Sequence, residues 1–197
     1  MKPLPFVWPW APVFWLVFLW SFAPEFQIIR RAEPSAKRPD SADQGSVRVI
    51  MAGSFLASTT AFLLSPLRQF QFPAPMQRGA FVAGLALLIA GSLLRRHCWR
   101  MLGASFTGDV RAHAEQQVVT TGAYAFVRHP SYTAGTMMNT GIGIALGSWA
   151  SALVMLVVSL VVYTYRMNVE ERALLAAIGE PYRAFLSGRK RLIPYIY

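Results

Sequence analysis

A histidine and an arginine stand side by side in the second half of the chain, as Arg128-His129, and Pro130 and Tyr132 follow them. Imidazole can take up or release a proton near neutral pH, and guanidinium binds anionic groups. Because proline is favoured in the first turn of a helix, Pro130 predicts a helix start. These polar side chains should therefore lie at a helix end.

A second polar group follows further along the chain. Arg166 and Glu170 are four residues apart, which places them on one face of a helix, and Glu171 comes next. Carboxylates bind cationic groups through charge-assisted hydrogen bonds. Taken singly, each residue also has a structural explanation: a solvated or ion-paired helix face for the glutamates, and a structural interfacial role for His129.

Other polar or glycine-rich patterns carry less chemistry. His97, Cys98 and His113 lack the spacing of metal ligands, so no metal site is predicted. The single Cys98 excludes an internal disulfide. The glycines within residues 141–147 follow no predicted strand, so we expect them to allow close helix contacts rather than to bind phosphate.

The distribution of charge predicts the elements that position these groups. Of the 197 residues 54% are apolar and 14% are charged, whereas about a quarter are charged in a soluble domain. About twenty apolar residues make one helical crossing of a bilayer. We expect an all-α integral membrane protein with about five transmembrane helices, at residues 5–24, 48–65, 79–95, 132–147 and 149–166.

The last helix should continue beyond the membrane as a cytosolic C-terminal extension that ends at Gly179. Residues 1–94 are expected to form an N-terminal membrane scaffold, and residues 95–197 a region that carries the chemistry. The first apolar stretch lacks a small-residue cleavage pattern, so we interpret it as a retained helix rather than a signal peptide.

Basic residues predict the orientation. They gather in the connections after the first and third helices and in the C-terminal tail, while the other connections have few. By the positive-inside rule the N-terminus lies outside and the tail in the cytosol, in an inner or cytoplasmic membrane. The net charge of +10 is explained by anionic headgroups, so no nucleic-acid partner is predicted.

The fourth and fifth predicted helices form a hairpin, which returns both of its ends to one membrane face. Residues 95–131 and 166–197 should therefore lie close together. Carboxylates and arginines at the mouth of an apolar bundle are costly unless they are partnered, and they mark function more often than not. The two groups are thus predicted to form one site.

The residues of this site match a known pattern. Three stretches resemble the isoprenylcysteine carboxyl methyltransferase family, whose wider relatives include phospholipid N-methyltransferases. They are TTGAYAFVRHPSY at 120–132, then YR with EE and GE-x-Y from Tyr165, and finally RLIP. The resemblance covers about residues 100–197. In one departure, Thr133-Ala134 follows Tyr132 and the glycine comes one residue later than usual, at Gly135.

The resemblance implies an S-adenosylmethionine pocket between the fourth helix, the extension of the fifth and the cytosolic segment that connects the third and fourth, with S-adenosylhomocysteine as the product. The residues that it implies as cofactor contacts are His129, Tyr132, Glu170, Glu171, Tyr124, Arg128 and Pro130, with Val118-Val119 beside the adenine. Arg166 is implied near the reacting centre, and Glu171 or His129 as the proton acceptor for an amine or thiol substrate.

The resulting expectation is methyl transfer to a membrane-embedded or lipophilic acceptor, with a carboxylate favoured. The partner would be a lipophilic small molecule, a lipid or a lipidated substrate in the bilayer, and the oligomeric state stays open. Three alternatives remain: a phospholipid amine or small thiol acceptor on the same scaffold, an NADPH-dependent membrane reductase, and a non-catalytic membrane protein.

Overall fold

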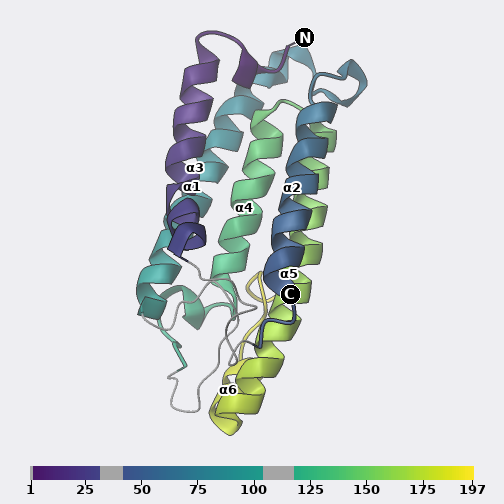
Figure 1. Cartoon of the computed structure of the whole chain (residues 1–197). Helices are drawn as coiled ribbons and strands as arrows, with labels where there is room; N and C mark the ends of the chain where they lie inside the picture. The colour runs from purple at the N-terminus through teal and green to yellow at the C-terminus, as the bar shows by residue number, and fades with distance from the viewer. Residues whose placement is uncertain (1, 32–41, 104–117) are drawn as a thin grey trace.

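The computed structural model describes residues 2–31, 42–103 and 118–197. Its helices are α1 (Trp10–Arg31), α2 (Ser46–Leu64), α3 (Gln77–Leu102), α4 (Pro130–Ala145), α5 (Trp149–Ile178) and α6 (Glu180–Ser187), joined by the 3-10 turns η1 (Leu4–Phe6), η3 (Arg68–Phe70), η4 (Ala74–Met76) and η6 (Gly122–Ala125). Figure 1 shows α1 to α5 side by side as a bundle, with the N-terminus at one end and α6 at the other.

The predicted all-α membrane fold with five long helices is confirmed, with shifts at the helix ends. α1 starts at Trp10 rather than at residue 5. Trp8 precedes Pro9, and proline disfavours the helical conformation in the residue before it. α3 continues past the predicted end at residue 95, since Arg95 pairs with Glu25 of α1 and donates a hydrogen bond to the Ser131 carbonyl (2.8 Å). The charge of Arg95 therefore does not end α3.

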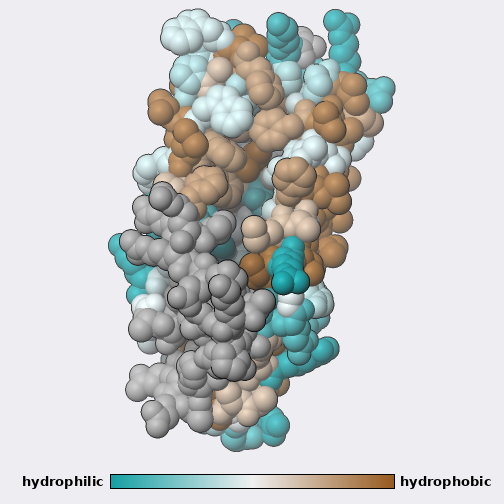
Figure 2. Space-filling view, in the orientation of Figure 1, coloured by the Kyte–Doolittle hydropathy of each residue, from teal (hydrophilic) through white to brown (hydrophobic). Residues whose placement is uncertain are grey.

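Within residues 2–31, 42–103 and 118–197, three helical stretches are long and apolar enough to cross a membrane: Ser46–Leu64, Ala74–Leu102 and Trp149–Ile178. The apolar part of α1, Trp10–Phe26, is shorter, and α4 has 16 residues. Large apolar side chains project outward from several helices; Leu16, Phe55, Leu56 and Val161 are each more than 60% exposed. Figure 2 shows hydrophobic residues across the middle of the described surface and hydrophilic ones towards both ends, as contact with lipid requires.

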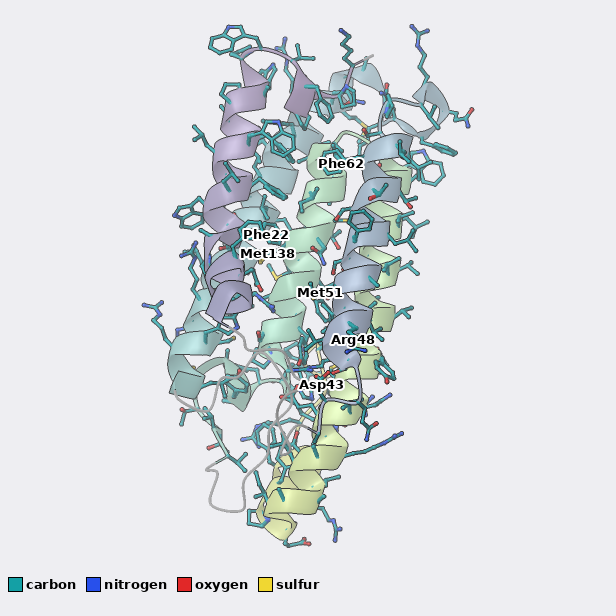
Figure 3. The ribbon with its side chains drawn as sticks, in the orientation of Figure 1. Phe22, Asp43, Arg48, Met51, Phe62 and Met138 are labelled. Carbon is teal, nitrogen blue, oxygen red and sulfur yellow. The ribbon has the colours of Figure 1, made fainter. Side chains whose placement is uncertain are left out.

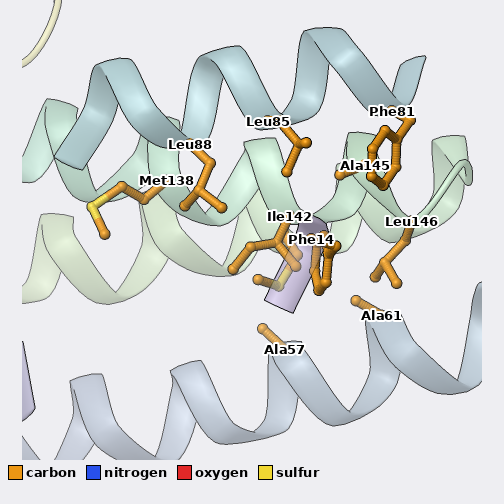
Figure 4. Packing of buried hydrophobic residues seen from close by; sticks show 11 residues of the cluster. Phe14, Ala57, Ala61, Phe81, Leu85, Leu88, Met138, Ile142, Ala145 and Leu146 are labelled. Carbon is orange, nitrogen blue, oxygen red and sulfur yellow. The ribbon is translucent and has the colours of Figure 1, made fainter. Parts of the chain in front are cut away.

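The core lies between α4 and its neighbours (Figure 4). Its buried members are Phe14, Ala57, Ala61, Phe81, Leu85, Leu88, Met138, Ile142, Ala145, Leu146 and Met155. All five long helices contribute, from Phe14 of α1 to Met155 of α5. Because lipid is as apolar as this core, the helices associate mainly through close van der Waals packing.

Glycines make that close packing possible between α3 and α4. A Cβ added at Gly84 would lie 2.3 Å from the Ala145 nitrogen and 2.6 Å from the Gly141 carbonyl oxygen. A Cβ at Gly141 would lie 2.7 Å from the Gly84 oxygen. The prediction that this glycine serves helix contact is confirmed.

The turn between α4 and α5 is as tight as expected. Gly147 adopts a positive φ of 74°, and the side chain of Ser148 accepts a hydrogen bond from the Ser151 nitrogen (3.1 Å) at the start of α5. Gln77 of α3 donates to the Gly147 carbonyl (3.1 Å), which fixes the turn against the bundle. The start of α4 and the end of α5 therefore lie together at the other end of the bundle, where the polar segments meet.

Candidate functional site

The start of α4 is held by the C-terminal segment. The Arg128 nitrogen donates to the Lys190 carbonyl (2.8 Å), and the His129 nitrogen donates to the Arg191 carbonyl (3.0 Å). The hydroxyl of Thr133 donates to the Leu192 carbonyl (2.7 Å). The backbone of residues 190–192 therefore lies across the first turn of α4.

Glu171 of α5 is the centre of a buried ionic cluster. Its Oε1 lies 3.1 Å from His129 Nε2 and 3.2 Å from Arg128 Nη1, and its Oε2 lies 2.7 Å from Arg191 Nη2. The side chains of Glu171 and His129 are 8% and 5% exposed. Two arginines offset the cost of burying this carboxylate.

Glu170 has a different environment. Its Oε2 accepts a hydrogen bond from the Tyr132 hydroxyl (2.6 Å) and lies 4.0 Å from His129 Nδ1. Its side chain is 31% exposed, so part of it faces away from these partners. The Tyr132 ring stacks on Tyr163, with 5.1 Å between the centroids, which fixes the hydroxyl in place.

The histidine and both glutamates, distant in sequence, thus meet as predicted. His129 lies within hydrogen-bonding distance of Glu171, and Tyr132 bridges to Glu170. The hairpin of α4 and α5 brings them to one end of the bundle. The cofactor and catalytic roles assigned to these residues stay predictions.

Arg166 is buried one turn before the glutamates. Its Nε donates to the Tyr132 hydroxyl (3.2 Å), and its Nη1 donates to Ser46 Oγ (2.6 Å) and forms an ion pair with Asp43. The Arg166 and Asp43 side chains are 6% and 4% exposed. Arg166 thereby connects the glutamate cluster to the segment that precedes α2.

Sequence patterns do not predict the contacts of Asp43 and Ser46 with Arg166 or that of Arg191 with Glu171. Asp43 lies in the region interpreted as a scaffold, and its available signal is a helix-start pattern, an aspartate three residues before Ser46. Arg191 was counted only as a basic residue of the tail. Glu25, whose partner is Arg95, is a further N-terminal carboxylate that pairs with the region from residue 95 onward.

Two tyrosines border the site outside the bundle. Tyr124 in η6 is buried, and burial, followed by the nearby Cys98 and Glu170, raises the pKa of its phenol. Tyr182 of α6 is buried too, and burial followed by the charges of Glu170 and Glu171 raises its pKa. Both phenols stay neutral near pH 7 and can donate hydrogen bonds.

The remaining predicted residues occupy the rim of the site. Pro130 is the first residue of α4 and is buried. Val119 is half-buried, and its neighbour Val118 packs against the cluster of Leu174, Tyr182 and Phe185. His113, Lys37, Arg38 and Arg111 lie outside the described residues.

A cleft of about 500 Å³ opens beside the ionic cluster. Arg128 lines it, together with Ala125, Phe126, Ser187, Gly188, Arg189, Lys190, Pro194 and Tyr195. The volume falls in the usual range of small-molecule pockets. Arg128 thus joins the cleft to Glu171, which it contacts on its other side.

Over the described ranges, no three histidine, cysteine, aspartate or glutamate side chains are grouped to hold a metal ion.

The helices pack closely around Ala134 and Gly135. Ala134 is fully buried, and a Cβ added at Gly91 of α3 would lie 2.8 Å from the Ala134 carbonyl oxygen. A Cβ at Gly135 would lie 2.4 Å from the Tyr163 hydroxyl. The glycine at 135 therefore admits Tyr163, the ring on which Tyr132 stacks.

Comparison with known proteins places this arrangement in a family. The family model described as phospholipid methyltransferase matches residues 80–180, just over half of the chain. The chain belongs to the phospholipid methyltransferase family. The stretch that matches this family runs from α3 to the start of α6 and includes His129, Tyr132 and both glutamates, whereas Asp43 and Arg191 lie outside it.

The predicted resemblance to isoprenylcysteine methyltransferases is confirmed. The chain is 30% identical over 116 residues to the protein-S-isoprenylcysteine O-methyltransferase of Schizosaccharomyces pombe, covering 58% of this chain and 49% of that protein. It is 29% identical to protein-S-isoprenylcysteine O-methyltransferase B of Arabidopsis thaliana, covering 57% and 58%.

A solved structure supports the same relationship. The eukaryotic intramembrane Ras methyltransferase ICMT (isoprenylcysteine carboxyl methyltransferase) aligns with a TM-score of 0.64 at 26% identity, covering 72% of this chain and 52% of that one. The chain spans about half the length of these relatives. The alignment covers 72% of this chain, so most of its fold is shared with that structure.

Proposed function

We propose that this protein transfers a methyl group from S-adenosylmethionine to a lipophilic acceptor held in the membrane, with a carboxylate as the favoured acceptor. The observation that carries the proposal is the cluster of His129, Glu170 and Glu171 at the open end of the α4–α5 hairpin. Membership of a methyltransferase family and the names of its relatives support it.

The residues present fit the proposed cofactor. S-adenosylmethionine carries an ammonium, a carboxylate, an adenine and a sulfonium, and the sulfonium supplies an electrophilic methyl group. Glu170, which is partly exposed, suits the ammonium, and Arg128, at the cleft wall, suits the carboxylate. Tyr124 and the half-buried Val119 offer an apolar border with a neutral donor for the adenine.

The two glutamates then have separate tasks. Glu171 is surrounded by His129, Arg128 and Arg191, so its charge is already balanced by the protein. Glu170 retains exposed surface and is oriented by the Tyr132 hydroxyl. We therefore assign ammonium binding to Glu170 and the support of the site to Glu171.

We assign binding of the methyl acceptor to Arg166. A carboxylate acceptor is ionised at neutral pH and needs no general base. Arg166 would orient it, while the surrounding bundle excludes water and aligns the reactants. For an amine or thiol acceptor, His129 and Glu171 remain the candidate proton acceptors.

Incubation of membranes that contain the protein with methyl-labelled S-adenosylmethionine tests the proposal. We expect label in a lipid-soluble or lipidated product, in base-labile form if the product is an ester. Glu170→Gln should weaken S-adenosylhomocysteine binding about tenfold or more, because it removes one charge from an ammonium site. Unchanged affinity in titration calorimetry would remove Glu170 from the cofactor site.

The rival activities give different results. A reductase would be stabilised against heat by NADPH and not by S-adenosylhomocysteine, whereas a non-catalytic protein would respond to neither. An amine or thiol acceptor would leave the label stable to base. The proposed location is an inner or cytoplasmic membrane, with α6 and the cleft facing the cytosol, as the distribution of basic residues favours.

A further inference from the structure

The partner of Arg166 is a carboxylate of the protein itself. Asp43 lies at the base of α2, the point at which the segment before α2 reaches α5 (Figure 3). One oxygen of Asp43 accepts a hydrogen bond from Ser46 Oγ (2.8 Å) and pairs with Arg166, and the other accepts one from the Val47 nitrogen (3.2 Å). The N-terminal end of a helix favours such a negative charge.

This segment is anchored to α5 at a second point. The Tyr165 hydroxyl donates to the Gln44 carbonyl (3.2 Å), and Ser46, whose Oγ accepts from Arg166, is fully buried. Asp43 is therefore held beside Arg166 by donors from α2 and α5. Its position does not depend on the ion pair alone.

An acceptor carboxylate that approaches Arg166 meets a charge already in place. Arg166 carries one positive charge, Asp43 contacts it directly, and Glu170 is connected to it through the Tyr132 hydroxyl. At a buried site like charges repel strongly, because the effective dielectric constant is far below that of water. An acceptor carboxylate therefore binds Arg166 more weakly than it would in the absence of Asp43, whereas a neutral group is little affected.

We infer that Asp43 is a specificity-determining residue that sets the charge preference of the acceptor site by competing with an acceptor carboxylate for Arg166. The inference rests on the proposed function, in which Arg166 orients the acceptor. The inference is not taken from the family, because Asp43 lies outside the stretch that matches the family model.

The test measures the affinity of the purified protein, saturated with S-adenosylhomocysteine, for two probes near neutral pH. One probe is a prenylated N-acetylcysteine, which has a free carboxylate, and the other is its methyl ester. Asp43→Asn keeps a side chain of the same shape, whose amide oxygen can still accept a hydrogen bond, and removes the charge. We expect it to tighten binding of the acid about tenfold or more and to leave the ester within about twofold.

Ser46→Ala is the matched control. It removes the hydroxyl that donates to Asp43 and accepts from Arg166 without changing the charge of the site, so the ratio of acid to ester affinity should stay within about twofold of wild type. Should Asp43→Asn not fold, Asp43→Ser supplies a second uncharged side chain that can accept a hydrogen bond.

The outcomes separate the two proposals. If S-adenosylhomocysteine still binds but the acid gains no affinity relative to the ester, the role of Asp43 is wrong and the methyltransferase proposal stands. If the wild-type protein binds no S-adenosylhomocysteine, the proposed function is wrong and the inference about Asp43 is lost with it.

Discussion

Glu170 and Glu171 are adjacent residues with different surroundings. The side chain of Glu171 is buried between two arginines and a histidine, whereas that of Glu170 is 31% exposed. We expect Glu171→Gln to lower the free energy of unfolding by about 2–3 kcal/mol, because breaking a buried ion pair leaves charge without a partner and both arginines here keep some contact with solvent. Thermal melting in detergent measures this change.

A matched control for this prediction is Glu180→Gln. Glu180 pairs with Arg183 at the surface of α6, with side chains 77% and 70% exposed, and an exposed pair adds little stability. We expect no measurable change in its melting temperature. Equal losses in the two variants would show that Glu171 is not the centre of a stabilising cluster.

At the scale of the helices, the packing of α3 on α4 depends on glycine. Because a Cβ at Gly84 would lie within 2.7 Å of three α4 backbone atoms, Gly84→Ala must separate the helices. Overpacking of this kind costs about 1–3 kcal/mol. We expect a lower melting temperature and weaker S-adenosylhomocysteine binding, since α4 carries the site at its other end.

Gly79 provides the comparison within the same helix. A Cβ there meets nothing within 4 Å. Gly79→Ala should therefore leave stability unchanged or raise it by up to about 1 kcal/mol, through the higher helix propensity of alanine. A melting temperature for Gly84→Ala that matches that of Gly79→Ala would contradict the proposed role of this contact.

At the scale of the whole molecule, the two ends of the bundle should face different compartments. The N-terminus and α6 lie at opposite ends in Figure 1. In a Cys98→Ala background, we expect Lys2→Cys to react with a membrane-impermeant maleimide only from outside, and Glu180→Cys only from the cytosolic side, because the basic segments stay in the cytosol. Lys2 is exposed, and the Glu180 side chain is 77% exposed, so both positions can react once placed in water. Labelling of both positions from one side would refute the orientation.

The number and approximate position of the helices could be predicted because they depend on composition. A stretch without charge that is long enough to cross a bilayer forms a helix, since no water is present to satisfy its backbone. The meeting of His129 with the glutamates followed from the same argument, because a tight turn at Gly147 must return α4 and α5 to one face. Helix ends were less predictable, as α3 shows: its arginines find partners inside the bundle.

The different surroundings of the two glutamates and the partner of Arg166 came only from the tertiary structure. Asp43 and Arg166 are 123 residues apart, and their contact depends on how the segment before α2 packs against α5. Neither hydropathy nor a local motif encodes that placement. Sequence periodicity indicates which face of a helix a side chain occupies, but burial and ion pairing depend on which neighbour covers that face, and only the assembled bundle decides that.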